Sequence, residues 1–273
     1  MKVLSIILGV ALLGSITAHA QYKLQYKVSN SGLLHYSAHS TMQQTESMMG
    51  QEAKVSAISD ESISVASENA AGELVFDMKV DSSKNTVIMP NGDTTNTPSP
   101  VVGKVREIRI HPDGEEISSR WLDTTFASAP AGQMREFTSF FFRLPTKEVS
   151  AGSTWNDNKT DTVSTPTGGG KILVNTNTDY TLVDQEKVAG ITCAKINFTG
   201  KVTLDGSTQA QGVDLKINGK GSISGTAMFD YANGRIVRIA GNSNQDVTMT
   251  PTGQNGNSIP MTQVATYDLT LVK

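Results

Sequence analysis

Val213–Tyr231 reads VDLKINGKGSISGTAMFDY, and this stretch decides the fold class of the chain. Its odd-numbered positions are apolar or glycine throughout, whereas its even-numbered positions are almost all polar. A period of two residues is typical of a β-strand, because successive side chains point to opposite faces of a sheet. One apolar and one polar face indicate an antiparallel sheet with one side in water.

An Asn-Gly pair follows this stretch and predicts a hairpin turn. A two-residue turn would place apolar side chains opposite charged ones. We therefore expect a three-residue loop, Ala232–Gly234, whose glycine takes the left-handed conformation. This loop would pair Phe229 with Val237 and Ala227 with Ile239, which keeps the apolar faces together.

The same alternation recurs along most of the chain, outward from this stretch in both directions. It is clear in Tyr22–Val28, Leu34–Met42, Leu74–Val80, Ile172–Leu182, Ala194–Phe198 and Ile259–Leu271. Several of these runs exceed the usual strand length of about five or six residues. Gly219, Gly221 and Gly225 fall on the apolar face, where missing side chains let a sheet curl or let another element approach closely. This pattern predicts a long, curved antiparallel sheet or half-barrel.

One segment, Ala131–Leu144, breaks the strand period and predicts a helix. Pro130 suits a helix start and Pro145 ends it. The apolar residues at helical spacing are Met134, Phe137, Phe141 and Leu144. Phe140 and Phe142 widen this apolar stripe, so we expect the Phe-rich helix to pack on the concave face of the sheet. The predicted fold class is therefore mainly β with one helix.

Met1–Ala20 has the pattern of a secretory signal peptide. Lys2 supplies the positive charge, Val3–Leu13 is the apolar region, and Ala18–Ala20 is a cleavage site of small residues. We expect a mature protein that starts at Gln21 and is exported to a periplasm or to the outside. Because the residue after the cleavage site is not cysteine, we expect no lipid anchor.

Length and charge fit one β-rich domain over residues 21–273. The chain has 273 residues, 23 basic and 26 acidic side chains and a net charge of −3. Basic residues are not clustered, which argues against nucleic-acid binding. No apolar run beyond the signal peptide reaches the roughly 20 residues of a transmembrane helix. Long alternating strands also fit a membrane barrel, but the aromatic content of 6% is low for its interfacial girdles.

Residues with catalytic or metal-binding chemistry are sparse. Cys193 is the single cysteine, so it is either an inert thiol or the site of an intermolecular bridge. His35 and His39 would lie about 13 Å apart on a strand, too far for one metal ion. Asp157, Asn158 and Asp161 could touch calcium, although a solvated loop explains them equally well. No nucleophile, acid–base or cofactor motif is present, and we expect no enzymatic activity, cofactor or metal.

Three groups of residues between 144 and 240 form a recognisable set: Leu144-Pro145 with Gly152-x-x-Trp155, Val188-x-Gly190-x-x-Cys193-x-Lys195-Ile196, and Gly225-x-x-x-Phe229-Asp230-x-x-x-Gly234. Together they resemble an uncharacterised family of exported bacterial all-β proteins, a domain of unknown function. The resemblance implies a curved half-barrel with a helix in its concave face. That shape is similar to the periplasmic lipoprotein-carrier proteins, and the family implies no catalytic residues.

A half-barrel closed by a Phe-rich helix can enclose an apolar cavity, which suggests that the protein binds a lipid or another hydrophobic small molecule. The candidate lining residues are Met134, Phe137, Phe141, Ile223, Phe229 and Tyr267. The alternative is a structural or adhesive component of a cell surface or extracellular matrix. Polar strand faces would suit that function, and the unpaired Cys193 could link chains.

Overall fold

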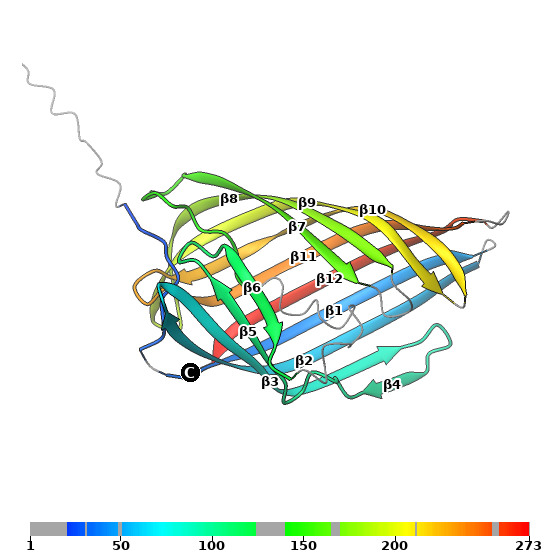
Figure 1. The fold of residues 1–273 in the computed structure, drawn as a ribbon, viewed down its shortest axis with the longest axis horizontal. Coiled ribbons are helices and arrows are strands. Elements are labelled where there is room, and N and C mark those ends of the chain that lie inside the picture. Colours follow the sequence, from blue (N-terminus) through cyan, green and yellow to red (C-terminus); the bar gives the residue numbers. More distant parts are fainter. Residues whose placement is uncertain are drawn as a thin grey trace, which may run out of the picture.

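Long antiparallel strands make up the regular structure of the computed structural model, which describes residues 21–30, 32–48, 51–123, 140–164, 170–210, 212–252 and 257–272 (Figure 1). The strands are β1 (Leu34–Met48), β2 (Gln51–Ala70), β3 (Glu73–Ile88), β4 (Thr94–Thr97), β5 (Val105–Ile110), β6 (Glu116–Trp121), β7 (Thr154–Ser164), β8 (Lys171–Val188), β9 (Ile191–Ala210), β10 (Val213–Asp230), β11 (Arg235–Pro251) and β12 (Ile259–Val272). They form one sheet in the order β6-β5-β3-β2-β1-β12-β11-β10-β9-β8-β7, with β4 paired to β3. The antiparallel sheet predicted from the alternation is therefore present.

The sheet consists of two meanders that meet at its centre. In sequence order, the first meander runs from β1 to β6 and the second from β7 to β12. They are joined by the β1–β12 ladder, which extends from His35↔Val272 to Glu46↔Met261. Consequently the two edge strands, β6 and β7, are neighbours in sequence but lie at opposite ends of the strand order.

The sheet curls until these two edges face each other (Figure 1). The Lys159 ammonium of β7 lies 3.2 Å from the Glu116 carboxylate of β6, so the approach of the edges is close enough for an ion pair. We call the line along which β6 and β7 face each other the seam.

The main hydrophobic core fills one end of the curled sheet. Its fully buried side chains come from both meanders and include Tyr36, Met78, Leu182 and Phe229. A second, smaller cluster, built on Leu204, Ile217 and Val247, lies farther along the concave face of β9, β10 and β11.

The glycines of β10 make room for large side chains of neighbouring strands. A Cβ atom on Gly219 would lie 2.8 Å from Leu204 Cδ1, and one on Gly225 would lie 2.5 Å from Phe198 Cζ. Leu204 and Phe198 belong to β9 and lie over the space that the glycines leave. The expected close approach at these glycines is therefore found.

The β10–β11 hairpin agrees with its predicted register over most of its length. Ala227 pairs with Ile239 as expected, but Phe229 pairs with Ile236 rather than with the next residue. A register shift between Met228 and Phe229 accounts for the difference, because a bulge places two residues opposite one. Gly234 takes the predicted left-handed conformation, with a φ of 65°.

The helix predicted over Ala131–Leu144 is wrong in its described part. Residues 140–144 contain no helix, and none is present elsewhere in the described chain. Residues 131–139, with the predicted lining residues Met134 and Phe137, lie outside the described residues. The fold over the described ranges is therefore all β rather than a sheet with one helix.

Backbone hydrogen bonds explain why 140–144 is not helical. The amide of Phe142 donates to the Tyr26 hydroxyl at 3.1 Å, and the amide of Leu144 donates to the Asp113 carbonyl at 2.7 Å. In a helix these amides would bond to carbonyls four residues earlier. Distant partners bond to them instead.

The three consecutive phenylalanines each find a different aromatic partner. The ring-centroid distances are 5.1 Å for Phe140 and Tyr36, 4.6 Å for Phe141 and Phe76, and 5.8 Å for Phe142 and Tyr180. A helix could turn only one face toward the sheet. A non-helical segment surrounded by the curled sheet makes aromatic contacts on several sides, so all three rings are packed.

The described residues contain no helix that is long and apolar enough to cross a membrane.

Candidate functional site

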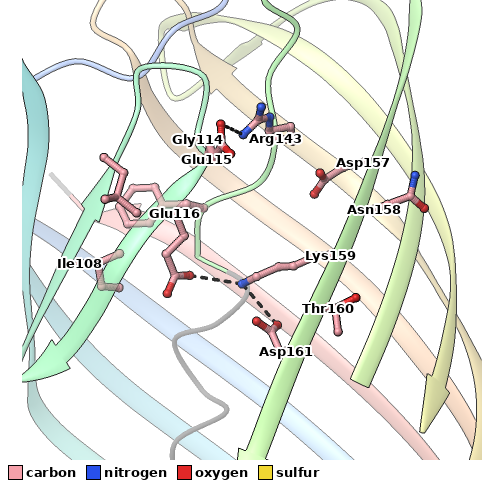
Figure 2. Close-up of a pocket in the computed structure, with 12 residues that line it drawn as sticks. Ile108, Gly114, Glu115, Glu116, Arg143, Asp157, Asn158, Lys159, Thr160 and Asp161 are labelled. Atoms are coloured by element: carbon pink, nitrogen blue, oxygen red, sulfur yellow. Dashed lines mark hydrogen bonds and ion pairs between the residues drawn. The ribbon is translucent and has the colours of Figure 1, made fainter. Parts of the chain in front are cut away.

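A pocket of about 450 Å³ lies at the seam (Figure 2). We call it the seam pocket. It is lined by Ile108, Gly114, Glu115, Glu116, Ile117, Phe141, Arg143, Asp157, Asn158, Lys159, Thr160 and Asp161. These residues come from β5, the β5–β6 turn, β6, segment 140–144 and β7. The curl of the sheet therefore builds the pocket from parts of the chain that no local pattern connects.

The apolar part of the pocket is continuous with the main core. Ile108 is buried, and Phe141 is half-buried with its ring 5.2 Å from Tyr26 in an edge-to-face contact. Ile117 on β6 is 40% exposed and adds an accessible apolar surface. A ligand in this pocket would therefore meet an apolar wall as well as charged groups.

Gly114 lets the β5–β6 turn pack against segment 140–144. Its φ of +86° lies in the left-handed region, and a Cβ atom there would lie 2.3 Å from the Phe142 carbonyl oxygen. The Asp113 carbonyl accepts the Leu144 amide next to this contact. The turn and the segment are thereby held together along one wall of the pocket.

In the charged part of the pocket, Arg143 and Lys159 each pair with two carboxylates. Arg143 lies 2.9 Å from the Glu115 carboxylate and 3.3 Å from that of Asp113. Lys159 lies 3.2 Å from the Glu116 carboxylate across the seam and 3.3 Å from Asp161 on its own strand (Figure 2). Hydrogen bonding to Arg143 lowers the pKa of Glu115, so this carboxylate is held in its ionised form.

Asp157 differs from these carboxylates because it forms no ion pair with any residue in the described part of the chain. It lies on the concave face of β7, two residues from both Trp155 and Lys159. Its charge raises the pKa of Tyr180, although burial of that hydroxyl is the larger cause. In Figure 2 Asp157 and Asn158 leave β7 on opposite sides, and Asp157 points toward the pocket.

The four predicted lining residues that are described occupy different places. Phe141 lines the seam pocket. Phe229 is fully buried in the core, 5.3 Å from the ring of Tyr26. Ile223 and Tyr267 are half-buried, and their side chains lie over Gly200 and Gly241 of neighbouring strands. These two lie on the concave face but are not part of the seam pocket.

The alternation of residues in β7 could have located the charged side of the pocket from the sequence alone. Trp155, Asp157, Lys159 and Asp161 share the face that the aromatic Trp155 marks as inward. Charges on the inward face of a strand are unusual and point to an edge or a site. The calcium hypothesis named Asp157, Asn158 and Asp161, which all lie in β7 rather than in a loop. Asn158 leaves the strand on the side opposite to Asp157 (Figure 2), and no group of three or more Asp, Glu, His or Cys side chains in the described residues could hold a metal ion.

Cys193 lies in a buried part of β9 with no exposed surface. Burial raises the pKa of its thiol to about 11, with a further contribution from the nearby Asp230 carboxylate. A thiol that is buried and protonated at neutral pH reacts slowly. A disulfide to another chain would therefore require local opening of the sheet.

Residues 131–236 match the model of DUF6263, a family of unknown function. The matched region contains segment 140–144 and β7, which supply seven of the lining residues: Phe141, Arg143, Asp157, Asn158, Lys159, Thr160 and Asp161. The other side of the pocket, from Ile108 to Ile117, precedes the match. The expected resemblance to an uncharacterised domain is confirmed. No curated protein matches the chain.

Proposed function

We propose that the protein is a non-catalytic binding protein for an amphipathic small molecule of the lipid class, and that the seam pocket is its binding site. The observation that supports this proposal is the composition of the pocket, in which an apolar wall adjoins a rim of charged side chains. An amphiphile has matching parts, since its chain gains free energy on leaving water while its polar end remains solvated or paired.

The size of the pocket fits such a ligand. Small-molecule sites have volumes of roughly 300 to 1,000 Å³ and combine apolar surfaces with a few polar groups. The pocket, at about 450 Å³, lies within this range. Each fully buried methylene contributes about 0.8 kcal/mol, so an alkyl chain packed against Phe141 and Ile117 gains affinity with every methylene that it removes from water.

A neutral fluorescent probe tests the proposal directly. N-phenyl-1-naphthylamine brightens in apolar surroundings and carries no charge at neutral pH. We expect it to bind the mature protein, and we expect Ile117→Ser to weaken binding about fivefold, because the variant removes an accessible apolar contact.

Ile88→Ser is the matched control for this experiment. Ile88 is 36% exposed, close to the 40% of Ile117, but it lies at the end of β3 outside the pocket. We expect this variant to bind the probe like the wild type. Equal loss in both variants, or no binding at all, contradicts the proposal.

We also propose that the protein is exported after removal of residues 1–20. The apolar region and small-residue cleavage site of the sequence support this proposal. Expression of the full chain in a bacterial host, followed by mass spectrometry of the intact product and of its N-terminal peptide, should show a chain that begins at Gln21. A product that retains Met1 in the cytoplasm contradicts it.

A further inference from the structure

We propose that the seam pocket selects ligands with a cationic group, such as an alkylammonium, and that Asp157 is the residue that binds it. This inference rests on the proposed function and adds the charge of the ligand. It follows from the charge balance of the pocket, from the pairing of its ionised groups and from the indole ring of Trp155 next to Asp157.

The lining of the pocket is negatively charged. Four carboxylates, of Glu115, Glu116, Asp157 and Asp161, face two cations, Arg143 and Lys159, which gives a net charge of −2. Asp113, Arg106 and His111 lie next to the lining and act on its ionised groups. The charges of Asp113 and Arg106 have opposite signs and offset each other. A concave site whose lining carries an excess of one sign of charge attracts ligands of the opposite sign.

Both cations of the lining are already neutralised. Arg143 has carboxylates of Asp113 and Glu115 within 3.3 Å, and Lys159 has those of Glu116 and Asp161 within the same distance. An anionic ligand would therefore have to displace a protein carboxylate and remain close to it. A cationic ligand avoids this cost because Asp157 has no ion-pair partner in the described structure.

One aromatic ring lies next to Asp157. Trp155 precedes Asp157 on the same face of β7, is half-buried, and stacks on Tyr180 with ring centroids 5.5 Å apart and an interplanar angle of 11°. Tyr180 is buried and also stacks on Phe142, so it offers no accessible face to a ligand. An indole ring attracts ammonium groups, which adds to the attraction of a nearby carboxylate. The apolar wall at Phe141 and Ile117 then holds the chain of the ligand.

Three probes with the same eight-carbon chain separate the charge from the apolar contribution. They are 1-octanol, octyltrimethylammonium and octyl sulfate, titrated into the mature protein and followed by calorimetry. The alcohol is kept below its aqueous solubility and the two ions below their micelle concentrations. We expect the ammonium to bind about tenfold more tightly than the alcohol and the sulfate to bind more weakly than the alcohol. The advantage of the ammonium should shrink in high salt.

Variants at Asp157 assign the preference to this residue. Asp157→Asn should remove the advantage of the ammonium, so that the ratio of the ammonium affinity to the alcohol affinity in this variant falls to about one. Asp157→Glu should keep most of the preference because it keeps the charge. Asp205→Asn is the matched control, since Asp205 is an exposed aspartate of β9 outside the pocket, and it should behave like the wild type.

The outcomes distinguish this inference from the proposed function. If the alcohol binds but the three probes have equal affinity, or if Asp157→Asn keeps the preference, the assignment to Asp157 is overturned and amphiphile binding stands. Tighter binding of the sulfate also overturns it. If none of the probes binds, including the alcohol, the proposed function is overturned and the inference with it.

Discussion

The Tyr26 hydroxyl forms two hydrogen bonds with the backbone of segment 140–144. It accepts a hydrogen bond from the Phe142 amide at 3.1 Å and donates one to the Phe142 carbonyl at 3.2 Å. Its side chain is 3% exposed, so water is a poor substitute for either partner. The hydroxyl replaces the ladder partner that a strand would give to this residue.

We expect Tyr26→Phe to lower the free energy of unfolding by about 2 kcal/mol, because it leaves a buried amide and carbonyl without partners. Urea unfolding followed by tryptophan fluorescence measures this loss. Tyr22→Phe is the control, since the Tyr22 hydroxyl has no hydrogen bond within the described residues, and we expect it to change stability by less than about 0.5 kcal/mol. Equal losses of unfolding free energy in the two variants would contradict the role of the Tyr26 hydroxyl in holding segment 140–144.

Gly114 and Gly152 form a matched pair for a second prediction at the residue scale. Both have a φ of +86°, but a Cβ atom on Gly114 meets the Phe142 carbonyl whereas nothing lies within 4 Å at Gly152. We expect Gly152→Ala to cost about 1 kcal/mol for the left-handed conformation alone. Gly114→Ala should cost about 3 kcal/mol, because the clash with the segment adds to the strain. Similar thermal shifts in both variants would show that the contact is not tight in solution.

Among the elements, strands with clear alternation such as β10 and β12 follow from the sequence, whereas segment 140–144 does not. The similar alternation of Tyr22–Val28 was misleading, because the structure has only an isolated bridge there, from Tyr22 to Val149. Alternation over Val213–Tyr231 predicts β10 almost residue for residue, because the apolar face of a strand is visible in its own sequence. The spacing of Met134, Phe137, Phe141 and Leu144 predicts a helix there instead. The partners that hold 140–144 in another conformation, such as Tyr26, 116 residues away from Phe142, lie far outside any local window.

The seam pocket also could not be predicted from local sequence patterns, because its lining residues are distant in the sequence. The sequence predicts Phe141 as a lining residue, but not the charged groups around it. Glu116 and Lys159 come from β6 and β7, and their approach depends on the curl of the whole sheet.

The inward charges of β7 have a second effect, since charges on an edge strand discourage pairing with strands of other molecules.

The ion pair across the seam gives a prediction at the element scale. Lys159 and Glu116 are about one-third exposed, so the pair contributes little to global stability, and we expect Lys159→Met to cost about 0.5 kcal/mol. Its larger effect should be local, with faster amide hydrogen exchange in β6 and β7. Lys195→Met, which removes a pair between the adjacent strands β8 and β9, is the control and should leave β6 unchanged. Unchanged exchange in both strands of the Lys159→Met protein would show that the pair does not hold the edges together.

At the scale of the whole molecule, buried tyrosines predict the response to alkaline pH. Burial raises the pKa of Tyr26, Tyr36 and Tyr180 well above the usual 10, and that of Tyr267 to about 12. The unfolded chain loses these protons near pH 10 while the folded chain retains them. Their stabilising contribution is therefore complete below pH 10 and is lost as the pH rises toward the folded-state values.

We expect the free energy of unfolding, measured by urea titration, to fall steadily above pH 10, by about 1.4 kcal/mol per pH unit for each such tyrosine. Absorbance at 295 nm checks the cause, because the native protein at pH 11 should show fewer ionised tyrosines than the protein in urea. Equal absorbance of the native and unfolded chains at that pH would contradict the prediction.

The central β1–β12 ladder sets the order in which the chain can fold. Most neighbouring strands are connected through short turns, and such hairpins form within microseconds. The ladder instead joins residues such as Thr41 and Thr266, which are 225 positions apart, so its closure carries a large entropic cost and comes late. Until then β1 and β12 each expose a long unpaired edge, and refolding at high protein concentration exposes the chain to aggregation. Pulse-labelled hydrogen exchange should find the amides of these two strands protected last.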